Sequence, residues 1–307
     1  MRKLFNKLKY VWILAIVIFV SLYFYKNFNL IFEAIEKLPF LNVVTAILAI
    51  SIAKVLLSYV SLLSTEYFSG TFTFPQMFKI YNITQLAKYI PGSIWQFVGK
   101  AGYYANHGLS VSNINKSLLV EVLWVFFTAV FFGAIFLFLS GIYVDLSFLL
   151  GRTKKYFYLY GFVVLLIIII CAYYYKKVHS FAHIVLHNYF LDLKILVTML
   201  MVWIFLGLSF FVTLIPFTEE ISLMTFVYII GLYALAYAVG FAVPFAPAGI
   251  GIRESILVFG VAELLVGDYG VLLASLNRVF YIVVELVIVI GITTKTMKEN
   301  IKNQKEV

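Results

Sequence analysis

The chain has 307 residues, of which 64% are hydrophobic and 12% are charged, and its net charge is +9. An ordinary soluble domain carries about 25% charged residues, and no stretch of about a hundred residues here has the mixed polarity of a water-facing surface. This composition therefore excludes a soluble globular protein. The positive charge does not indicate a nucleic-acid partner, because basic residues in a membrane protein first report its orientation. We predict an all-α integral membrane protein whose single transmembrane domain covers residues 1–307.

About eight apolar segments are long enough to cross a hydrocarbon layer of about 30 Å. In chain order they are 10–25, 41–64, 117–140, 157–175, 195–215, 221–243, 252–267 and 271–293. The first lacks the small residues of a signal-peptide cleavage site, so we expect it to stay as an uncleaved span. Between the second and third, residues 66–116 are too apolar for a plain loop and too often interrupted by lysine for a lipid-exposed span. We expect a re-entrant or interfacial helix pair there, broken at Pro91-Gly92.

The basic residues indicate how the chain crosses the membrane. With the N-terminus inside, the cytoplasmic segments hold four basic residues in the N-terminal tail, four in 66–116, three in 176–195 and four in the C-terminal tail. The opposite side holds two in 26–39 and three in 141–156. Fifteen basic residues on the cytoplasmic side and five on the opposite side follow the positive-inside rule. We therefore predict a multi-pass protein of the cell membrane with both termini in the cytoplasm.

Two helix breaks have the same arrangement. The first lies around Pro91 in KYIPGSIWQFVGK, and the second lies around Pro247 in FAVPFAPAGIGIRESILVFG. Proline ends a helix and glycine lets the backbone approach a ligand, so each break begins a new helix whose free amides can receive an anion. Paired breaks are typical of a transporter's midplane site and favour two pseudo-symmetric halves, 1–156 and 157–307. The alternative is that both breaks are kinks that serve packing.

The string PAGIGIRESILV resembles the signature of the lysylphosphatidylglycerol synthase transmembrane (flippase-like) domain family, whose members carry a Pro-(Gly/Ala)-Gly-x-Gly-x-Arg-Glu motif. KYIPGSIWQFVGK resembles the earlier Pro-Gly motif of the same family. The resemblance implies a role in moving a lipid or a lipid-linked sugar between leaflets. The chain departs from the fused members because it has no aminoacyl transferase domain, so we do not expect it to make an aminoacylated lipid. Many members have Glu-Arg where this chain has Glu121-Val122, so no role of that arginine carries over.

The residues around the breaks are the candidates for binding an anionic headgroup. Arg253 can present a planar fork to phosphate, and Glu254 complements the positive end of the helix that it begins. Gln96 and Lys100, one turn apart, give the first break a comparable set of donors. An interfacial arginine that snorkels to the headgroups is the alternative for Arg253. The expected substrate-binding residues are Arg253, Glu254, Gly249, Gly251, Pro247, Pro91, Gly92, Gln96, Lys100 and Glu121.

Further ionisable residues lie at membrane depth. Lys54 is near the middle of its span, where an unpaired charge costs roughly 3 kcal/mol or more. Glu285 is similarly deep in the last span, and Arg278 lies two turns earlier on the same face. We expect these three to form an intramembrane charge network, either structural or part of a proton or substrate relay. Lys88 is expected to complement a negative helix terminus. Three histidines within 179–187 favour an interfacial cytoplasmic helix over a metal site, and no metal or cofactor is expected.

Three classes of function are compatible with these features. The leading hypothesis is a flippase that moves an anionic or polyprenyl-linked lipid by alternating exposure of a cavity between the broken helices. The second is a membrane-embedded transferase acting on lipids, although no nucleophile and base occur at a recognisable spacing. The third is a non-catalytic membrane partner of envelope-biosynthesis proteins such as a polysaccharide synthase. No nucleotide-binding motif is present, so ATP is not expected to drive transport directly.

Overall fold

The computed structural model describes residues 28–90, 94–142, 192–219, 221–243 and 246–305. Nearly all of them belong to one compact unit, Met1–Gly141 with Lys194–Val307, and the second unit, Ile142–Leu193, lies almost entirely outside the described residues. The spans expected at 10–25 and 157–175 and the histidines within 179–187 also lie outside them. The arrangement of two pseudo-symmetric halves therefore stays a prediction.

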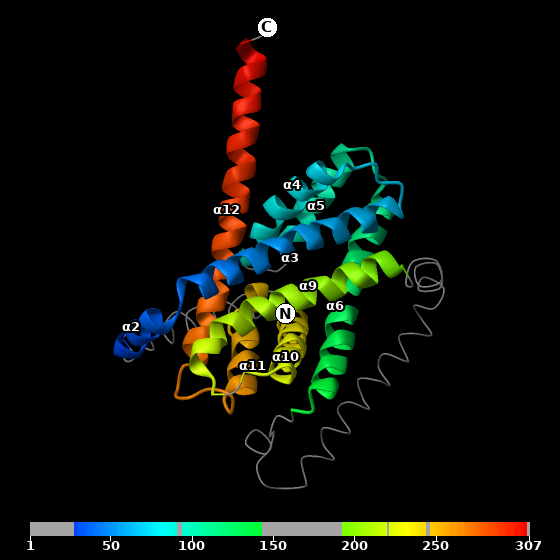
Figure 1. The fold of residues 1–307 in the computed structure, drawn as a ribbon. Coiled ribbons are helices and arrows are strands. Elements are labelled where there is room, and N and C mark those ends of the chain that lie inside the picture. Colours follow the sequence, from blue (N-terminus) through cyan, green and yellow to red (C-terminus); the bar gives the residue numbers. More distant parts are fainter. Residues whose placement is uncertain (1–27, 91–93, 143–191, 220, 244–245, 306–307) are drawn as a thin grey trace, which may run out of the picture. The chain divides into compact units, whose positions relative to one another are not determined.

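The described residues form helices joined by short connections, which confirms the all-α fold (Figure 1). Their bounds are α2 Phe28–Lys37, α3 Phe40–Glu66, α4 Phe74–Gln85, η1 Leu86–Tyr89, α5 Trp95–Asn106, α6 Val111–Ser140, α9 Leu193–Leu214, η2 Ile215–Phe217, α10 Leu223–Ala242, η3 Pro247–Gly249, α11 Ile252–Val261 and α12 Gly270–Lys305.

Within the described ranges, five helical segments are long and apolar enough to cross a membrane: α3, α6, α9 together with η2, α10, and α12 as far as Lys295. They match the expected spans at 41–64, 117–140, 195–215, 221–243 and 271–293. The expected span at 252–267 is not a continuous helix. Its helical part, α11, has ten residues and reaches only about 15 Å at 1.5 Å per residue.

Local sequence signals set the ends of the long helices. The Ser110 hydroxyl accepts a hydrogen bond from the Asn113 amide at 3.3 Å and caps the start of α6. Gly141 ends the same helix in the left-handed conformation, with φ of 64°, which glycine adopts without steric cost. Ser222 caps α10 in the same way as Ser110 caps α6, accepting from the Thr225 amide at 3.0 Å.

Glycine brings α6 and α10 into close contact. A Cβ atom on Gly231 of α10 would lie 2.8 Å from the backbone nitrogen of Leu137 and 2.9 Å from the carbonyl oxygen of Gly133 on α6. Gly207 allows α9 to approach α10 as closely, because a Cβ there would lie 2.7 Å from the Cα of Ile230. Small residues at such crossings are typical of helix packing in membranes, where dispersion contacts replace the hydrophobic effect.

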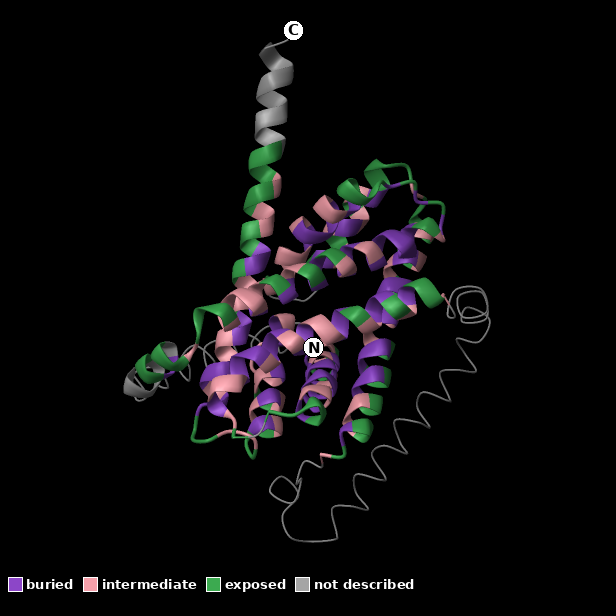
Figure 2. Cartoon of the chain, viewed as in Figure 1, coloured by how far each residue is buried: buried purple, intermediate pink, exposed green. Residues whose placement is uncertain are grey.

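The long helices have exposed outward faces, green in Figure 2, that carry many large hydrophobic side chains. Large hydrophobic side chains are exposed along α3, α6 and α12, whereas the polar and charged side chains described below are buried. A water-facing surface would show the opposite distribution. The exposed residues include Leu48, Ile52, Val55, Phe127, Phe131, Phe138, Val283, Val287 and Ile290.

Connections expected on the outer side of the membrane meet at one end of this unit. Thr218, before α10, forms an antiparallel bridge with Leu265, after α11, and the Val266 amide donates to the carbonyl of Phe217 at 2.9 Å. The segments before α10 and after α11 therefore lie side by side, and α10, η3 and α11 form a helical hairpin. We call residues 217–266 the α10–α11 hairpin.

Candidate functional site

The first break separates two short helices. Thr73 and Gln76 form a capping box at the start of α4, the 3-10 helix η1 ends at Tyr89, and the next helix begins at Trp95. A capping box and a 3-10 turn satisfy terminal backbone groups without extending the helix. The interruption expected near Pro91 is therefore present, although Pro91 and Gly92 themselves lie outside the described residues.

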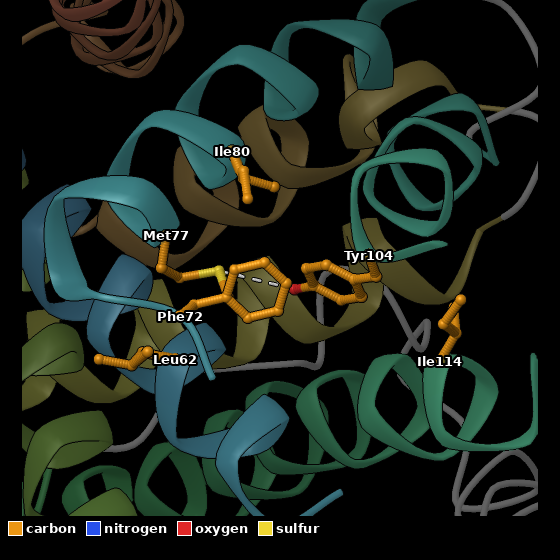
Figure 3. Close-up of a cluster of buried hydrophobic side chains, with 6 residues drawn as sticks. All are labelled: Leu62, Phe72, Met77, Ile80, Tyr104 and Ile114. Carbon is orange, nitrogen blue, oxygen red and sulfur yellow. Dashed lines mark hydrogen bonds between the residues drawn. The ribbon is translucent and has the colours of Figure 1, made fainter. Parts of the chain in front are cut away.

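A hydrophobic cluster fixes the two short helices against their neighbours (Figure 3). Its buried members come from α3, the α3–α4 connection, α4, α5 and α6. The Tyr104 hydroxyl of α5 points toward the sulfur of Met77 on α4 at 3.6 Å, and the same hydroxyl lies 3.3 Å from the Ser61 hydroxyl of α3. The cluster thus fixes the position of α5, which carries Gln96 and Lys100. Its six buried residues are Leu62, Phe72, Met77, Ile80, Tyr104 and Ile114.

The second break depends on positive φ angles and on one close backbone approach. Ala248, Gly249 and Gly251 have φ of 52°, 70° and 86°. A Cβ on Gly249 would lie 3.0 Å from three backbone atoms of Gly240 on α10, so the turn packs directly on that helix. The Arg278 guanidinium of α12 donates to the Ala248 carbonyl at 2.7 Å. An arginine from a third helix thereby supplies the hydrogen bond that the broken backbone leaves unmade.

Glu254 occupies the start of α11. Its Oε2 accepts a hydrogen bond from the Gly251 amide at 2.7 Å, which is the expected complement to a positive helix end. Its Oε1 lies 3.6 Å from Nε of Arg278, an ion pair too long for a hydrogen bond. The protein's own carboxylate therefore takes part of the anion-binding capacity that we expected from the free amides of this helix.

A cavity of about 240 Å³ lies between the two breaks. Residues flanking both breaks line it together with residues of α6 and α12, which is the arrangement that the paired motifs predict. The lining residues are Tyr81, Gln85, Lys88, Ile94, Gln96, Phe97, Glu121, Val122, Val125, Tyr237, Gly240, Phe241, Val243, Ala246, Ala248, Gly249, Arg253, Arg278 and Tyr281.

Glu285 forms the first of two buried ion clusters. Its Oε1 pairs with Lys54 at 2.7 Å and with Lys88 at 2.6 Å, and its Oε2 accepts from the Tyr89 hydroxyl at 2.7 Å. Lys54 and Glu285 are 0% and 1% exposed. Two lysines from different helices thus share one carboxylate in an apolar environment, where each charge needs a partner. The expected pairing of Lys54 with Glu285 is present.

Glu121 forms the second cluster. It pairs with Lys100 of α5, and its Oε2 accepts from the Ser61 hydroxyl of α3 at 2.8 Å. Lys100 also donates to the Ser61 hydroxyl at 3.2 Å, and its ammonium lies 4.4 Å from the centroid of the Tyr81 ring. Lys100 is therefore engaged by protein groups and does not line the cavity, whereas Glu121 does.

Arg253 of α11 faces the cavity without a carboxylate. It is 3% exposed, and across the part of the chain that the structure describes, no hydrogen bond or ion pair engages its guanidinium. Its Cζ lies 4.2 Å from the centroid of the Tyr233 ring and 5.6 Å from the centroids of Tyr237 and Tyr281. The rings stabilise the cation through their negative faces and leave its donors available. Because Arg253 is buried beside the cavity, it does not act as an interfacial anchor within this unit.

The expected site residues divide into three groups: those that line the cavity, those that lie outside its lining, and Pro91 and Gly92, which lie outside the described residues. Arg253, Gly249, Gln96 and Glu121 line the cavity together, as does Arg278, which we had placed in the charge network with Glu285. That placement is wrong, because Arg278 contacts Ala248 and Glu254 instead. The residues with supporting positions outside the cavity lining are Pro247, Gly251, Glu254, Lys100, Lys54 and Glu285.

Two residues that contact several charged groups of the site, Lys88 and Tyr281, were not predicted from the sequence. Lys88, expected only to complement a helix terminus, pairs with Glu285 and lines the cavity. The ring of Tyr281 lies beside four cations: its centroid is 5.7 Å from Lys54, 4.8 Å from Lys88, 5.6 Å from Arg253 and 6.0 Å from Arg278. The signal was present in the spacing of 278, 281 and 285, which places an arginine, a tyrosine and a glutamate on one helix face.

A comparison with models of protein families and a comparison with curated proteins found no match.

Proposed function

We propose that this protein moves an anionic lipid, or a lipid-linked saccharide, between the two leaflets of the cell membrane. The observation that carries the proposal is Arg253: a buried arginine, with no carboxylate partner among the described residues, that faces a cavity between two broken helices. A guanidinium offers a planar fork of donors that matches two oxygens of a phosphate. The headgroup phosphate would bind there.

The charges around the cavity support an anionic ligand. Among the residues that the structure describes, five cationic side chains line it or support its walls, against three carboxylates, so positive charge is in excess by two. An uncompensated charge away from water is costly, and an anion that enters the cavity would offset that cost. The cations are Lys54, Lys88, Lys100, Arg253 and Arg278, and the carboxylates are Glu121, Glu254 and Glu285.

The size and walls of the cavity support a headgroup and not a whole lipid. Its volume of about 240 Å³ is below the range of about 300–1,000 Å³ of pockets that enclose an entire small molecule. Apolar residues such as Ile94, Phe97 and Phe241 also line it. A phosphate-bearing headgroup would bind inside while its acyl or prenyl chains stay in the hydrocarbon of the bilayer.

The proposal includes the topology and the family that the sequence indicates. Eight crossings with cytoplasmic termini place the connections before α10 and after α11 on the same side, and the bridge between Thr218 and Leu265 is consistent with this placement. The resemblance of PAGIGIRESILV and KYIPGSIWQFVGK to the flippase-like domain family supports the same function, in an envelope-biosynthesis context. Alternating exposure of the cavity would transfer the headgroup between leaflets.

The experiment compares Arg253→Lys and Arg253→Ala with the wild-type chain in proteoliposomes that contain one labelled lipid at a time. Anionic and polyprenyl-linked lipids are tested, and appearance of the label in the opposite leaflet is measured. We expect both variants to lose about ten- to hundredfold in transport, because lysine keeps the charge but loses the fork. Lys116→Ala, which removes a cation outside the cavity lining, should transport at the wild-type rate. Full transport by the Arg253→Lys variant would refute the role of Arg253 as the phosphate ligand.

A further inference from the structure

The number of unpaired cations at the cavity predicts how many negative charges the ligand carries, in addition to the fact that the ligand is an anion. Lys100 is balanced by Glu121, and Arg278 is balanced by Glu254. Two cations remain. One is Arg253, which has no carboxylate partner among the described residues. The other arises at Glu285, where a single carboxylate serves both Lys54 and Lys88.

The two uncompensated charges face the same space. Of the lysines that share Glu285, Lys54 is fully buried behind the cavity, whereas Lys88 lines it, with a side chain that is 12% exposed. Lys88 lies 4.8 Å and Arg253 lies 5.6 Å from the centroid of the same Tyr281 ring. Because these distances add to 10.4 Å, the two cations are at most that far apart, which is within the reach of one diphosphate and, at a shorter separation, of one phosphomonoester. Lys88 comes from the first break and Arg253 from the second, so such a headgroup would join the two breaks.

We infer that the cavity selects a headgroup with two negative charges on phosphate, either a phosphomonoester or a diphosphate, over a phosphodiester with one. This inference rests on the proposed function and names the substrate class of the same site. A phosphodiester would neutralise one of the two cations and leave the other buried without a partner. A phosphomonoester carries about −1.5 to −2 at pH 7, and a diphosphate carries at least as much. Either of these two headgroups balances both unpaired cations.

Lys88 is the residue that sets this selectivity. When it is removed, Glu285 remains paired with Lys54, and the positive excess falls from two charges to one without breaking the deepest ion pair. The preference for a dianionic headgroup should then disappear while binding of a monoanionic headgroup through Arg253 persists. Removing Lys116, a cation that is also partly buried but lies outside the cavity lining, should leave the preference unchanged.

The test is a binding titration of the full chain in neutral detergent at pH 7, with three short-chain probes. Dioctanoyl phosphatidic acid is the phosphomonoester, farnesyl diphosphate is the diphosphate, and dioctanoyl phosphatidylglycerol is the phosphodiester control. We expect the first two to bind about ten- to hundredfold more tightly than the third, the difference of one charge-assisted contact. In Lys88→Met all three should bind alike, and Lys116→Met should behave as wild type. A difference between the two tight probes would tell whether the natural ligand is a monoester or a diphosphate.

Several outcomes separate this inference from the proposed function. Equal affinity of the wild-type chain for all three probes refutes the charge selectivity, even if transport in proteoliposomes is observed. Tight, Lys88-dependent binding of the dianions without transport supports the selectivity and refutes the flippase function. The comparison of probes on the wild-type chain does not depend on the folding of any variant. Loss of binding by Lys116→Met as well as by Lys88→Met would refute a specific role of Lys88.

Discussion

Replacing Glu285 with glutamine exchanges one carboxylate oxygen for an amide nitrogen. We expect it to destabilise the fold more than any other substitution of this size in the site. The substitution keeps the shape of the side chain but removes the charge that pairs with Lys54 at 2.7 Å and with Lys88 at 2.6 Å. Lys54 is 0% exposed, so it cannot reach water when its partner is lost. Breaking a buried ion pair from one side costs about 3–5 kcal/mol, and we expect a loss of that size in the free energy of unfolding.

The measurement is unfolding of the purified chain in mixed micelles, followed by circular dichroism as a denaturing detergent is added. Glu33→Gln is the matched control, because its ion pair with Lys37 has the same length of 2.6 Å but is about half exposed, and exposed pairs contribute little. The double variant Lys54→Met with Glu285→Met should recover most of the loss, because it removes both deep charges. If Glu285→Gln unfolds at the same detergent concentration as the wild-type chain, the cluster does not stabilise the fold.

Two further predictions concern helix packing and the second break. Gly231→Leu should cost about 1–3 kcal/mol or more in the same unfolding assay, because its side chain would enter the backbone of α6, whereas Gly291→Leu, at an open position of α12, should have little effect. Arg278→Gln loses the bond to the Ala248 carbonyl, so we expect faster hydrogen exchange of the amides at 249–251 and unchanged exchange in α6. Unchanged exchange at the break would contradict the role of Arg278.

The apolar pattern was sufficient to predict the long helices, because membrane-crossing length and hydrophobicity are properties of a contiguous segment. The sequence could not show that the segment at 252–267 contains a helix of only ten residues. Its composition is mostly apolar, and hydropathy does not register that the helix ends at Val261, after which a turn leads to Leu265, which pairs with Thr218. The conformation of the break before this helix depends in the same way on what the backbone packs against, because Gly249 contacts Gly240, and that contact is not visible in the apolar pattern.

Site residues that belong to a sequence motif could be predicted. Site residues whose role depends on a contact with a distant part of the chain could not. Arg253 and Gly249 belong to a recognisable string and do line the cavity. The partner of Arg278 could not be found from spacing, because spacing favours Glu285 on its own helix, whereas the contact with Glu254 comes from α11 and is tertiary. Lys88 was underestimated for a related reason. A lysine at a helix end has an adequate local explanation, and only the approach of α12 shows that Glu285 is within reach.

The α10–α11 hairpin is tied along its whole length, and this limits how the cavity can change shape. Its base is closed by the bond from Val266 to Phe217, and its middle by the bond from the Tyr228 hydroxyl to the Gly260 carbonyl at 2.7 Å. At its tip, Gly249 packs on the backbone of Gly240. Opening the hairpin would break all three connections at once. We therefore expect the hairpin to move as one body in any change of the shape of the cavity.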